Sequence, residues 1–471
     1  MKTYAYANSL LHINGRWRGG QLPDVPVLDP ATEASIGTVA TAGVQDLDEA
    51  TACAERTFWT WRRMRAAERG RILMRAADLL RKRVEPIAHL LTMEQGKPLA
   101  EARAEAAAAA ALLDWFANEG ASHGGGTVSA EARQAAPDEP IGPVAAFAAW
   151  SFPLGQAARK VAAALADGSS IVLAGPPSAP ASCAALVVAL ADAGLPAGVL
   201  NLVYGPQADI APYLIAHPAI ARGSYSGPAL LGARLAALAK TRGKRLAIEL
   251  SGPAPAIVFS DADLELAVAA LCRAKFRNAG QARFAPTCIF TESSIHARFL
   301  DDFIEATRRI TIGNGLQQGV EMGPLANGCR TAKMEALVAD AVAGSATLAA
   351  GGHRMGNLGC FFWPTVLTDV AADALLMNTE PFGPITVVNR FDRYEDGIAG
   401  LNGLRPVLAL HAFTTSRKRM DRLNRDFASD MLFLNQRDGR VLTQPYGDIG
   451  GGHGDDSLEG YVQARLIGQS A

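Results

Sequence analysis

The chain has 471 residues, which is enough for two or three domains around a large buried core. Hydrophobic residues make up 49% of it and charged residues 19%, a composition typical of a soluble globular protein. Lys and Arg together number 45 against 46 for Asp and Glu. This near-zero net charge gives no basic excess that would favour binding to nucleic acid or to an anionic membrane surface.

Six cysteines are spread along the chain without a CxxC pair: Cys53, Cys183, Cys272, Cys288, Cys329 and Cys360. In a chain of this length such spacing favours reduced thiols over a disulfide framework, and each cysteine is expected to be a buried structural residue. The first residues also lack the apolar core and small-residue cleavage site of a secretory signal. We therefore expect a cytoplasmic protein.

Residues 46–116 show helical periodicity, with breaks expected at Pro86 and around Gly96. The most apolar part, residues 106–117, is too short to span a bilayer, and a second apolar stretch at residues 182–200 carries a charged residue and ends in Gly-Leu-Pro. Both stretches are expected to be packed helices, so no association with a membrane is predicted.

From residue 141 onward, short apolar runs alternate with helical segments. Strands are expected at 142–150, 170–173, 200–204 and 223–225, and helices at 156–167 and 179–193. Apolar runs of this kind are typical of strands buried on both faces. The alternation predicts a parallel, doubly wound sheet.

A second series of the same kind begins after Glu249. Strands are expected at 254–260, 288–292, 384–391, 407–415 and 431–436, and helices at 261–276 and 294–310. The sequence thus predicts an α/β protein with two doubly wound parallel-sheet domains. We assign residues 1–120 and 142–248 to the first domain, which is of the dinucleotide-binding type, and residues 249–447 to the second, which is of the catalytic type.

Two segments remain outside these domains. Residues 124–139 are rich in Gly and Ala and would suit an exposed hairpin, and residues 460–468 would suit an edge strand. Exposed strand edges are usually covered by a partner. We therefore expect residues 121–141 and 448–471 to form an oligomerisation arm in a homodimer or homotetramer.

A dinucleotide fingerprint is not evident. No GxGxxG follows an expected strand, and the glycines of residues 313–319 lack the strand-turn-helix context. The junction at residues 225–232 is a better candidate for a phosphate site, because a helix N-terminus offers free N–H groups. Pro228 removes one of these donors.

Seven segments, in order along the chain, together resemble the aldehyde dehydrogenase superfamily. They are AAWSFP (148–153), GLPAGVLNLVYG (194–205), YSGP (225–228), IELSGPAPAIVFSDADL (248–264), FRNAGQAR (276–283), EPFGP (380–384) and QPYGDIGGG (444–452). The resemblance implies an aldehyde dehydrogenase-like fold and NAD(P)-dependent oxidation of an aldehyde. In that reaction a cysteine thiolate attacks the carbonyl, an asparagine amide stabilises the oxyanion, and a glutamate assists hydrolysis.

The nucleophile of the family's "GQ-x-C" motif falls on Arg283 in this chain, and the general base matches Glu249 at the expected spacing. An arginine stays protonated and has no free lone pair, so it cannot form the covalent adduct. The oxyanion donor falls on Ser151, whose shorter side chain is expected to weaken this stabilisation by roughly 100- to 1000-fold in rate. Cys272 and Cys288 are not expected to substitute. Without the thiol, Glu249 is about equally well explained as a structural residue near the domain linker.

The cofactor side is also altered. The family's lysine in "VLKPSE" falls on Ala174, and the serine that follows Gly227 in the family pattern falls on Pro228. Loss of a charged hydrogen bond costs about 1.5–3 kcal/mol, so binding of NAD or NADP is predicted to be weak or absent. The resemblance also assigns three matching residues to the cofactor, Trp150, Glu380 and Phe382, and the last two are expected to touch the nicotinamide ribose and ring. A structural turn is the alternative explanation for the last two.

Residues 93–105, 158–168 and 275–281 look most similar to succinate-semialdehyde dehydrogenases. In that branch two arginines bind the substrate carboxylate, and they carry over to Arg159 and Arg277. The planar guanidinium matches a carboxylate with two parallel hydrogen bonds. Plain helix surface for Arg159 and a packing ion pair for Arg277 are the alternatives.

Arg283 has two possible roles. In the first, it adds a third positive charge to those of Arg159 and Arg277, and the three hold a small carboxylate or aldehyde ligand without turnover. In the second, it fills the tunnel or pairs with Glu249, and we slightly favour this second role. We expect a dehydrogenase-fold protein that lacks thiol-dependent activity. The alternatives are an oxidoreductase that uses Glu249 and a bound water, and a partner subunit of an active paralogue. No metal site is predicted.

Overall fold

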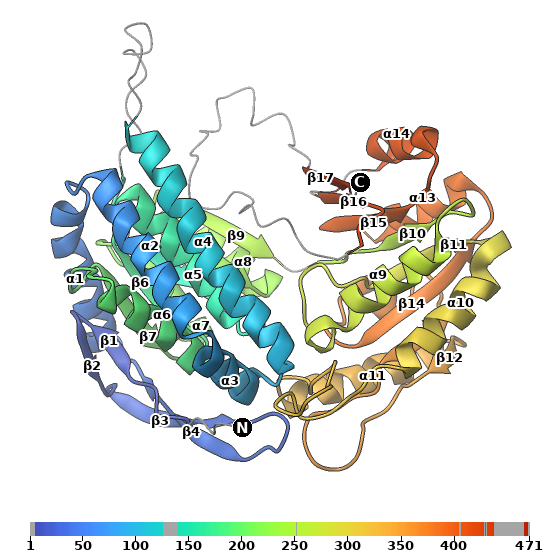
Figure 1. Ribbon diagram of the computed structural model, residues 1–471, viewed down its shortest axis with the longest axis horizontal. Coiled ribbons are helices and arrows are strands. Elements are labelled where there is room, and N and C mark those ends of the chain that lie inside the picture. The colour runs from blue at the N-terminus through green and yellow to red at the C-terminus, as the bar shows by residue number, and fades with distance from the viewer. Residues whose placement is uncertain are drawn as a thin grey trace, which may run out of the picture.

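The computed structural model describes residues 5–125, 140–250, 252–404, 407–427, 429, 431–437 and 466–469. These residues form two lobes, each built on its own sheet (Figure 1). The first lobe runs from blue to green in Figure 1 and the second from yellow to red. A separate two-stranded sheet pairs β3 (Leu22–Leu28) with β4 (Ser35–Thr41).

The sheet of the first lobe has seven strands in the order β2-β1-β7-β6-β5-β8-β9. They are β1 (Leu11–Ile13), β2 (Arg16–Arg18), β5 (Val144–Phe147), β6 (Ile171–Gly175), β7 (Leu200–Tyr204), β8 (Arg222–Gly227) and β9 (Arg245–Leu250). The five strands from β5 to β9 are parallel, and β1 joins the edge at β7 in the antiparallel direction. Strands β5, β6 and β7 are buried along their whole length, as their apolar runs predict.

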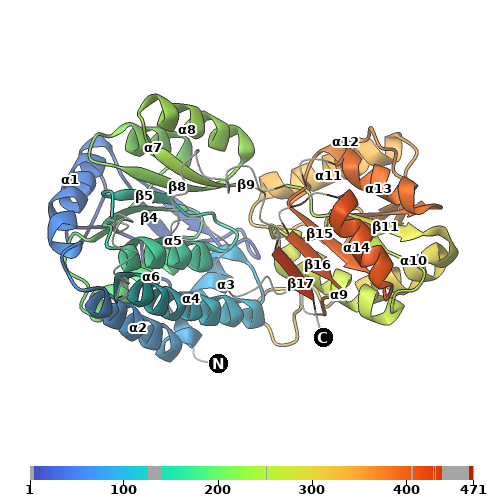
Figure 2. The ribbon, with the colours of Figure 1, turned by 90° about the horizontal axis from the view of Figure 1, so that it is seen from above.

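Helices cover both faces of this sheet: α7 and α8 lie over one face and α5 and α6 over the other, with α2 and α4 outside them (Figure 2). The helices of the first lobe are α1 (Val44–Trp61), α2 (Ala66–Lys82), α3 (Val84–Gln95), α4 (Leu99–Gly125), α5 (Pro153–Asp167), α6 (Pro180–Asp192), α7 (Gln207–Ala216) and α8 (Ala229–Thr241).

The helix break expected at Pro86 lies elsewhere. Helix α2 ends at Lys82 and α3 begins at Val84, so Pro86 sits in the first turn of α3. A proline is tolerated there because the first N–H groups of a helix have no intrahelical acceptor. The break around Gly96 is confirmed: Gly96 has φ 90° and ends α3.

The second sheet has eight strands in the order β12-β13-β14-β11-β10-β15-β16-β17. They are β10 (Ala256–Val258), β11 (Cys288–Glu292), β12 (Thr347–Ala350), β13 (Thr365–Thr368), β14 (Ile385–Phe391), β15 (Ala409–Phe413), β16 (Met431–Leu434) and β17 (Leu466–Gln469). All neighbours are parallel except β12 and β13. The prediction of two parallel-type α/β sheets is confirmed.

Helices α9 and α10 lie on one face of the second sheet and α13 on the other (Figure 2). The helices of this lobe are α9 (Leu264–Phe276), the short 3-10 helix η2 (Arg277–Gly280), α10 (Ser293–Arg308), α11 (Gly328–Ala343), α12 (Leu375–Asn378), α13 (Tyr394–Gly403) and α14 (Arg417–Asp426). An aspartate caps α9, with the Asp263 side chain accepting a hydrogen bond from Leu266 N at 3.1 Å.

The structure describes only part of the two segments that were expected to form an oligomerisation arm. Strand β17 ends the second sheet, which confirms an edge strand for residues 466–469, and the rest of residues 448–471 lies outside the described residues. Helix α4 continues through Gly125, so the expected hairpin does not begin at residue 124. The remainder of that hairpin, residues 126–139, is not among the described residues.

All six cysteines are free, and five of them are buried. Cys329 is the exception to the prediction of buried cysteines, because it lies exposed in the first turn of α11. Across the part of the chain that the structure describes, no helix is both long and apolar enough to cross a membrane.

Candidate functional site

Glu249 is the centre of a charged cluster between the two lobes. It is buried in β9. Strand β9 lies on the side of the first lobe that faces the second (Figure 2). Its Oε1 lies 2.7 Å from Nη2 of Arg159 and 3.7 Å from Nη1 of Arg283. Its Oε2 accepts a hydrogen bond of 2.7 Å from the Ser226 hydroxyl. A single buried carboxylate thus interacts with two guanidinium groups and one hydroxyl.

Secondary structure explains how these residues meet. Ser226 and Glu249 are register partners in the parallel strands β8 and β9. Arg159 projects from α5. Gln156, on the same helix, has its Oε1 3.1 Å from the Ser226 hydroxyl oxygen. Arg283 comes from the second lobe, in the loop between η2 and β11. The cluster therefore joins a strand, a helix and a loop that are distant in sequence.

The short helix η2, which leads into the loop that carries Arg283, has an unusual backbone. Asn278 and Ala279 both have φ 52°, a left-handed conformation that costs free energy in residues other than glycine. Gly280 follows with φ 71°, and a Cβ at that position would lie 2.1 Å from the carbonyl oxygen of Gly383. Only glycine fits this close approach. The Gln281 side chain secures the loop further by accepting a hydrogen bond from Ala326 N at 2.9 Å.

Ser151 lies beside this loop, and its main chain is tightly held. Its carbonyl oxygen accepts hydrogen bonds from Lys97 Nζ and from Asn278 Nδ2, both at 3.0 Å. The residue is buried, with 8% of its surface exposed. The structure thus brings Ser151 next to the loop of Arg283, as the family resemblance implies, while fixing it through its backbone.

Lys97, which donates a hydrogen bond to the Ser151 carbonyl, belongs to a buried polar network that was not predicted from the sequence. Lys97 Nζ lies 2.5 Å from Glu105 Oε2, and both side chains are almost fully buried. Glu105 Oε1 in turn accepts the amide hydrogens of Leu154 and Gly155 in the first turn of α5. Burial lowers the pKa of Lys97. The available signal was the pair of acidic residues at 101 and 105, which share one face of the alanine-rich helix α4, with Lys97 just before that helix.

Arg277 takes part in the same network. Its guanidinium lies 5.0 Å from the centre of the Phe152 ring, and the Lys97 ammonium lies 4.1 Å from the same ring. Burial raises the pKa of the nearby Glu101 to about 7, and the charges of Lys97 and Arg277 oppose that rise. These packing and charge partners favour a structural role for Arg277, which was the alternative to binding a substrate carboxylate. Arg159, in contrast, is paired with Glu249 rather than lying on plain helix surface.

Two thiols of the second lobe, those of Cys272 and Cys288, are poorly suited to replace a nucleophile. Burial raises the pKa of the Cys272 thiol to about 11 and raises the pKa of the Cys288 thiol further. Because the thiolate is the nucleophilic form, such thiols are inert near neutral pH. This agrees with the expectation that neither cysteine substitutes at the site.

Comparison with known proteins identifies the family. The sequence profile described as "Aldehyde dehydrogenase family" matches residues 17–466. The chain belongs to the aldehyde dehydrogenase family. It is 37% identical over 476 residues to 4-(hydroxymethyl)benzenesulfonate dehydrogenase TsaD1 of Comamonas testosteroni, with 99% of each chain covered.

Two further relatives agree with this family and fold. The succinate-semialdehyde dehydrogenase [NADP(+)] GabD of Escherichia coli (strain K12) is 34% identical over 441 residues, which cover 93% of this chain and 92% of GabD. The NAD+ complex structure of the aldehyde dehydrogenase from Bacillus cereus superimposes with a TM-score of 0.87 at 28% identity, covering 92% of this chain and 89% of that chain. The predicted family and fold are confirmed. The lost activity, the cytoplasmic location and the oligomer stay predictions.

The adenosine side of this aldehyde dehydrogenase does not fit an NAD(P) molecule well. Ala174 is buried in β6 and offers no charged group. Pro228 occupies the N-cap of α8, follows Gly227, and provides neither a hydroxyl nor an N–H donor. The two positions that the resemblance assigns to this half of the cofactor thus lack the donors that a ribose or a phosphate requires.

The other residues that the resemblance assigns to the cofactor also contact protein groups. Trp150 and Phe382 meet edge to face with their ring centres 5.7 Å apart. Arg330 lies 5.0 Å from the first ring centre and 5.1 Å from the second. The backbone oxygen of Glu380 accepts a hydrogen bond from Lys333 Nζ at 2.9 Å. Sequence reasoning missed Arg330, because none of the segments that carry the resemblance contains it.

Lys275 gives this aldehyde dehydrogenase a testable dependence of stability on pH. Burial lowers the pKa of Lys275 to about 7, while the charge of Glu380 acts in the opposite direction. The folded chain therefore binds this proton less well than the unfolded chain, and the unfolding free energy rises as pH increases from about 7 toward the ordinary pKa of lysine.

We expect Lys275→Met to remove this contribution. The stability advantage of the variant over the wild type should be largest at about pH 6 and should shrink by about pH 9. Urea unfolding of both proteins across this range measures the difference. An advantage that stays constant with pH would contradict the assignment.

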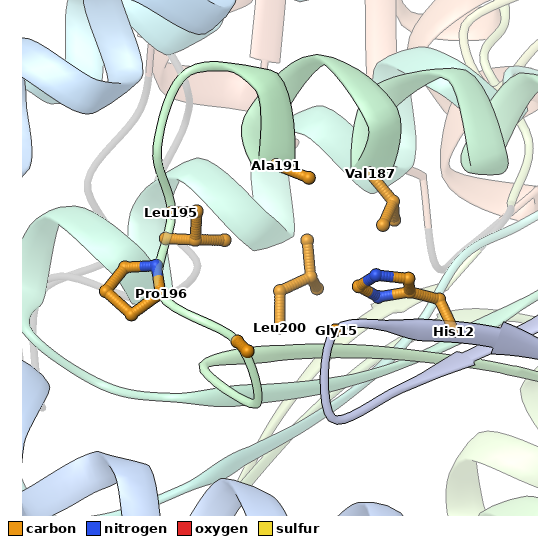
Figure 3. Close-up of a pocket in the computed structure, with 8 residues that line it drawn as sticks. His12, Gly15, Val187, Ala191, Leu195, Pro196 and Leu200 are labelled. Atoms are coloured by element: carbon orange, nitrogen blue, oxygen red, sulfur yellow. The ribbon is translucent and has the colours of Figure 1, made fainter.

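A small pocket lies away from these groups, between the β1–β2 hairpin and α6 (Figure 3). It has a volume of about 160 Å³ and an apolar lining with one histidine, His12. Burial lowers the pKa of His12. None of the residues that the resemblance assigns to the reaction lines this pocket.

Proposed function

We propose that this aldehyde dehydrogenase family protein has no thiol-dependent aldehyde oxidation and instead binds a small acidic molecule at the Glu249 cluster. The observation that carries the proposal is the position of Arg283, within ion-pair distance of Glu249. The resemblance assigns this position to the nucleophile. A guanidinium has no lone pair with which to attack a carbonyl carbon, so the covalent step has no starting point.

The charges of the cluster favour an anionic ligand. Two guanidinium groups face one carboxylate, which leaves an excess of positive charge. Arg159 and Arg283 keep 20% and 30% of their side-chain surfaces exposed, so a ligand can reach them. Guanidinium groups bind carboxylates and other planar oxyanions with parallel hydrogen bonds.

The names of the relatives support the same ligand class. TsaD1 is named for a benzenesulfonate and GabD for succinate semialdehyde, and both compounds carry an acidic group apart from the carbon that is oxidised. We propose a carboxylate or sulfonate of similar size as the ligand here. Weak or absent binding of NAD(P) is part of the proposal and is supported by Ala174 and Pro228.

An oxidoreductase that uses Glu249 and a water molecule is the less favoured alternative. A water would have to compete with protein groups, because Oε1 lies 2.7 Å from Nη2 of Arg159 and Oε2 accepts the hydrogen bond of Ser226. Proton transfer requires the base to be within hydrogen-bond reach of the proton it removes. The cluster as it stands directs both oxygens toward protein groups.

The proposal predicts binding without turnover. Wild-type protein from a host that lacks aldehyde dehydrogenases should form no NADH or NADPH from succinate semialdehyde above a heat-denatured control. Calorimetry should detect binding of succinate or of 4-(hydroxymethyl)benzenesulfonate. Arg283→Met should weaken that binding by about 10- to 100-fold, because it removes a charged hydrogen-bond donor.

Arg298→Met is the matched control, since Arg298 has 77% of its side chain exposed and lies on α10. Turnover by wild type that disappears in Glu249→Gln would instead establish the oxidoreductase alternative. Equal anion affinity in wild type and Arg283→Met would remove the cluster from the binding site.

A further inference from the structure

Arg330 fills the corner formed by two aromatic rings. The guanidinium lies 5.0 Å from the Trp150 ring centre and 5.1 Å from that of Phe382. The rings themselves meet at 83° with their centres 5.7 Å apart. Three nearly equal distances place the charge against both rings at once, an arrangement in which each ring contributes a cation–π attraction.

The backbone holds Arg330 and both of its neighbours in place. Asn327 caps α11 and accepts the amide hydrogen of Arg330 at 3.1 Å, which fixes the first turn of the helix. Phe382 has φ 48°, a left-handed conformation that only surrounding contacts can maintain. Gly383 packs so closely on Met334 of α11 that a Cβ there would lie 2.3 Å from the Met334 sulfur. Helix α11 and the Phe382 turn therefore form one packed unit.

The charges around Glu380 reinforce this arrangement. The negative charge of Glu380 raises the pKa of Arg330 and of Lys333, and so opposes the effect of burial on both groups. Arg330 is largely buried, and a buried cation is stable only where opposite charge and aromatic faces replace its water.

We propose that Arg330 occupies the place of the nicotinamide end of a dinucleotide and thereby excludes it. The resemblance assigns Glu380 and Phe382 to the nicotinamide ribose and ring and assigns Trp150 to the cofactor. Arg330 lies against both aromatic rings and interacts electrostatically with Glu380. The inference deepens the proposed loss of cofactor binding and rests on it. It adds a second obstacle, independent of Ala174 and Pro228, at the opposite end of the cofactor.

The proposal predicts how the two halves of the cofactor bind. A nicotinamide ring must first displace Arg330, so its apparent affinity is reduced by the fraction of molecules in which the corner is open. Arg330→Ala leaves the corner open. We expect Arg330→Ala to bind reduced nicotinamide mononucleotide at least about tenfold more tightly than the wild type. Binding of ADP, which represents the adenosine half, should not change.

Calorimetry with these two probes on the full-length chain tests the proposal. Arg330→Gln, which is neutral and shorter but keeps a polar side chain, should improve mononucleotide binding by a smaller factor and provides a second variant if Arg330→Ala does not fold. Arg298→Ala is the control for removal of an arginine elsewhere. Equal mononucleotide affinity in wild type and in the folded Arg330 variants would overturn the proposal. A loss of affinity in the variants would also overturn it and would make Arg330 a ligand of the cofactor.

This experiment separates the inference from the proposed function. Equal anion affinity in the wild type and in Arg283→Met would refute the proposed binding site without altering the comparison of mononucleotide affinities. Unchanged mononucleotide affinity would refute the role of Arg330 and would leave the absence of a nucleophile intact.

Discussion

Arg283→Cys alone is expected to remain close to inactive, whereas Arg283→Cys combined with Ser151→Asn should oxidise succinate semialdehyde roughly 100- to 1000-fold faster. The single variant restores a thiol beside Glu249 and also removes one of the two guanidinium groups that face this carboxylate. It still lacks the amide that stabilises the oxyanion. The second substitution provides that donor, and such donors contribute the stated factor.

The measurement is NADPH or NADH formation at the highest soluble cofactor concentration, because weak cofactor binding would otherwise mask the chemical step. Arg283→Ala with Ser151→Asn is the matched control, since it opens the same space without a thiol. A covalent acyl adduct detected by mass spectrometry in the double variant would establish the thioester route. Full activity in Arg283→Cys alone would mean that Ser151 already serves as the oxyanion donor.

Lys97→Met should destabilise the folded chain by about 3–5 kcal/mol, the usual cost of removing one partner of a buried ion pair. The Lys97 and Glu105 side chains are 0% and 2% exposed, so the carboxylate that remains would be left without its counter-charge and away from water. Loss of the hydrogen bond from Lys97 to the Ser151 carbonyl would also loosen the segment that carries Ser151.

A second substitution separates the charge from the other contacts of Glu105. Lys97→Met with Glu105→Gln should recover much of the lost stability, because a glutamine oxygen can still accept the amide hydrogens of Leu154 and Gly155. Lys82→Met, at an exposed position, is the control. Urea unfolding measures all three variants. Equal destabilisation by the single and the double variant would show that the unpaired charge is not the cause.

The strands of the two large sheets were largely predictable, and those near the N-terminus were not. The apolar runs at β7 and β11 coincide with the observed strands, because strands buried on both faces leave few polar residues in the sequence. Strand β3 contains Pro23, Asp24 and Pro26 and is mostly exposed, so no apolar pattern distinguishes it from a loop. Its pairing with β4 determines its conformation.

The candidate site was predictable as a set of positions but not as a set of contacts. Sequence motifs assigned roles to Glu249 and Arg283, and their pairing was one of two possibilities considered. The shorter contact between Arg159 and Glu249 was not expected, because the resemblance directed Arg159 toward a substrate. Contacts between residues so distant in sequence depend on how the two lobes meet, and no local pattern encodes that geometry.

The close approach of Gly280 to Gly383 has an implication for how such a protein can change. The turn before position 283 is held by backbone packing and by Gln281, and none of these contacts involves the arginine side chain. Exchange of that side chain therefore requires no rearrangement of the main chain. A nucleophile at this point can be lost or regained through a single substitution while the surrounding architecture persists, so forms with and without the thiol are near neighbours in sequence space.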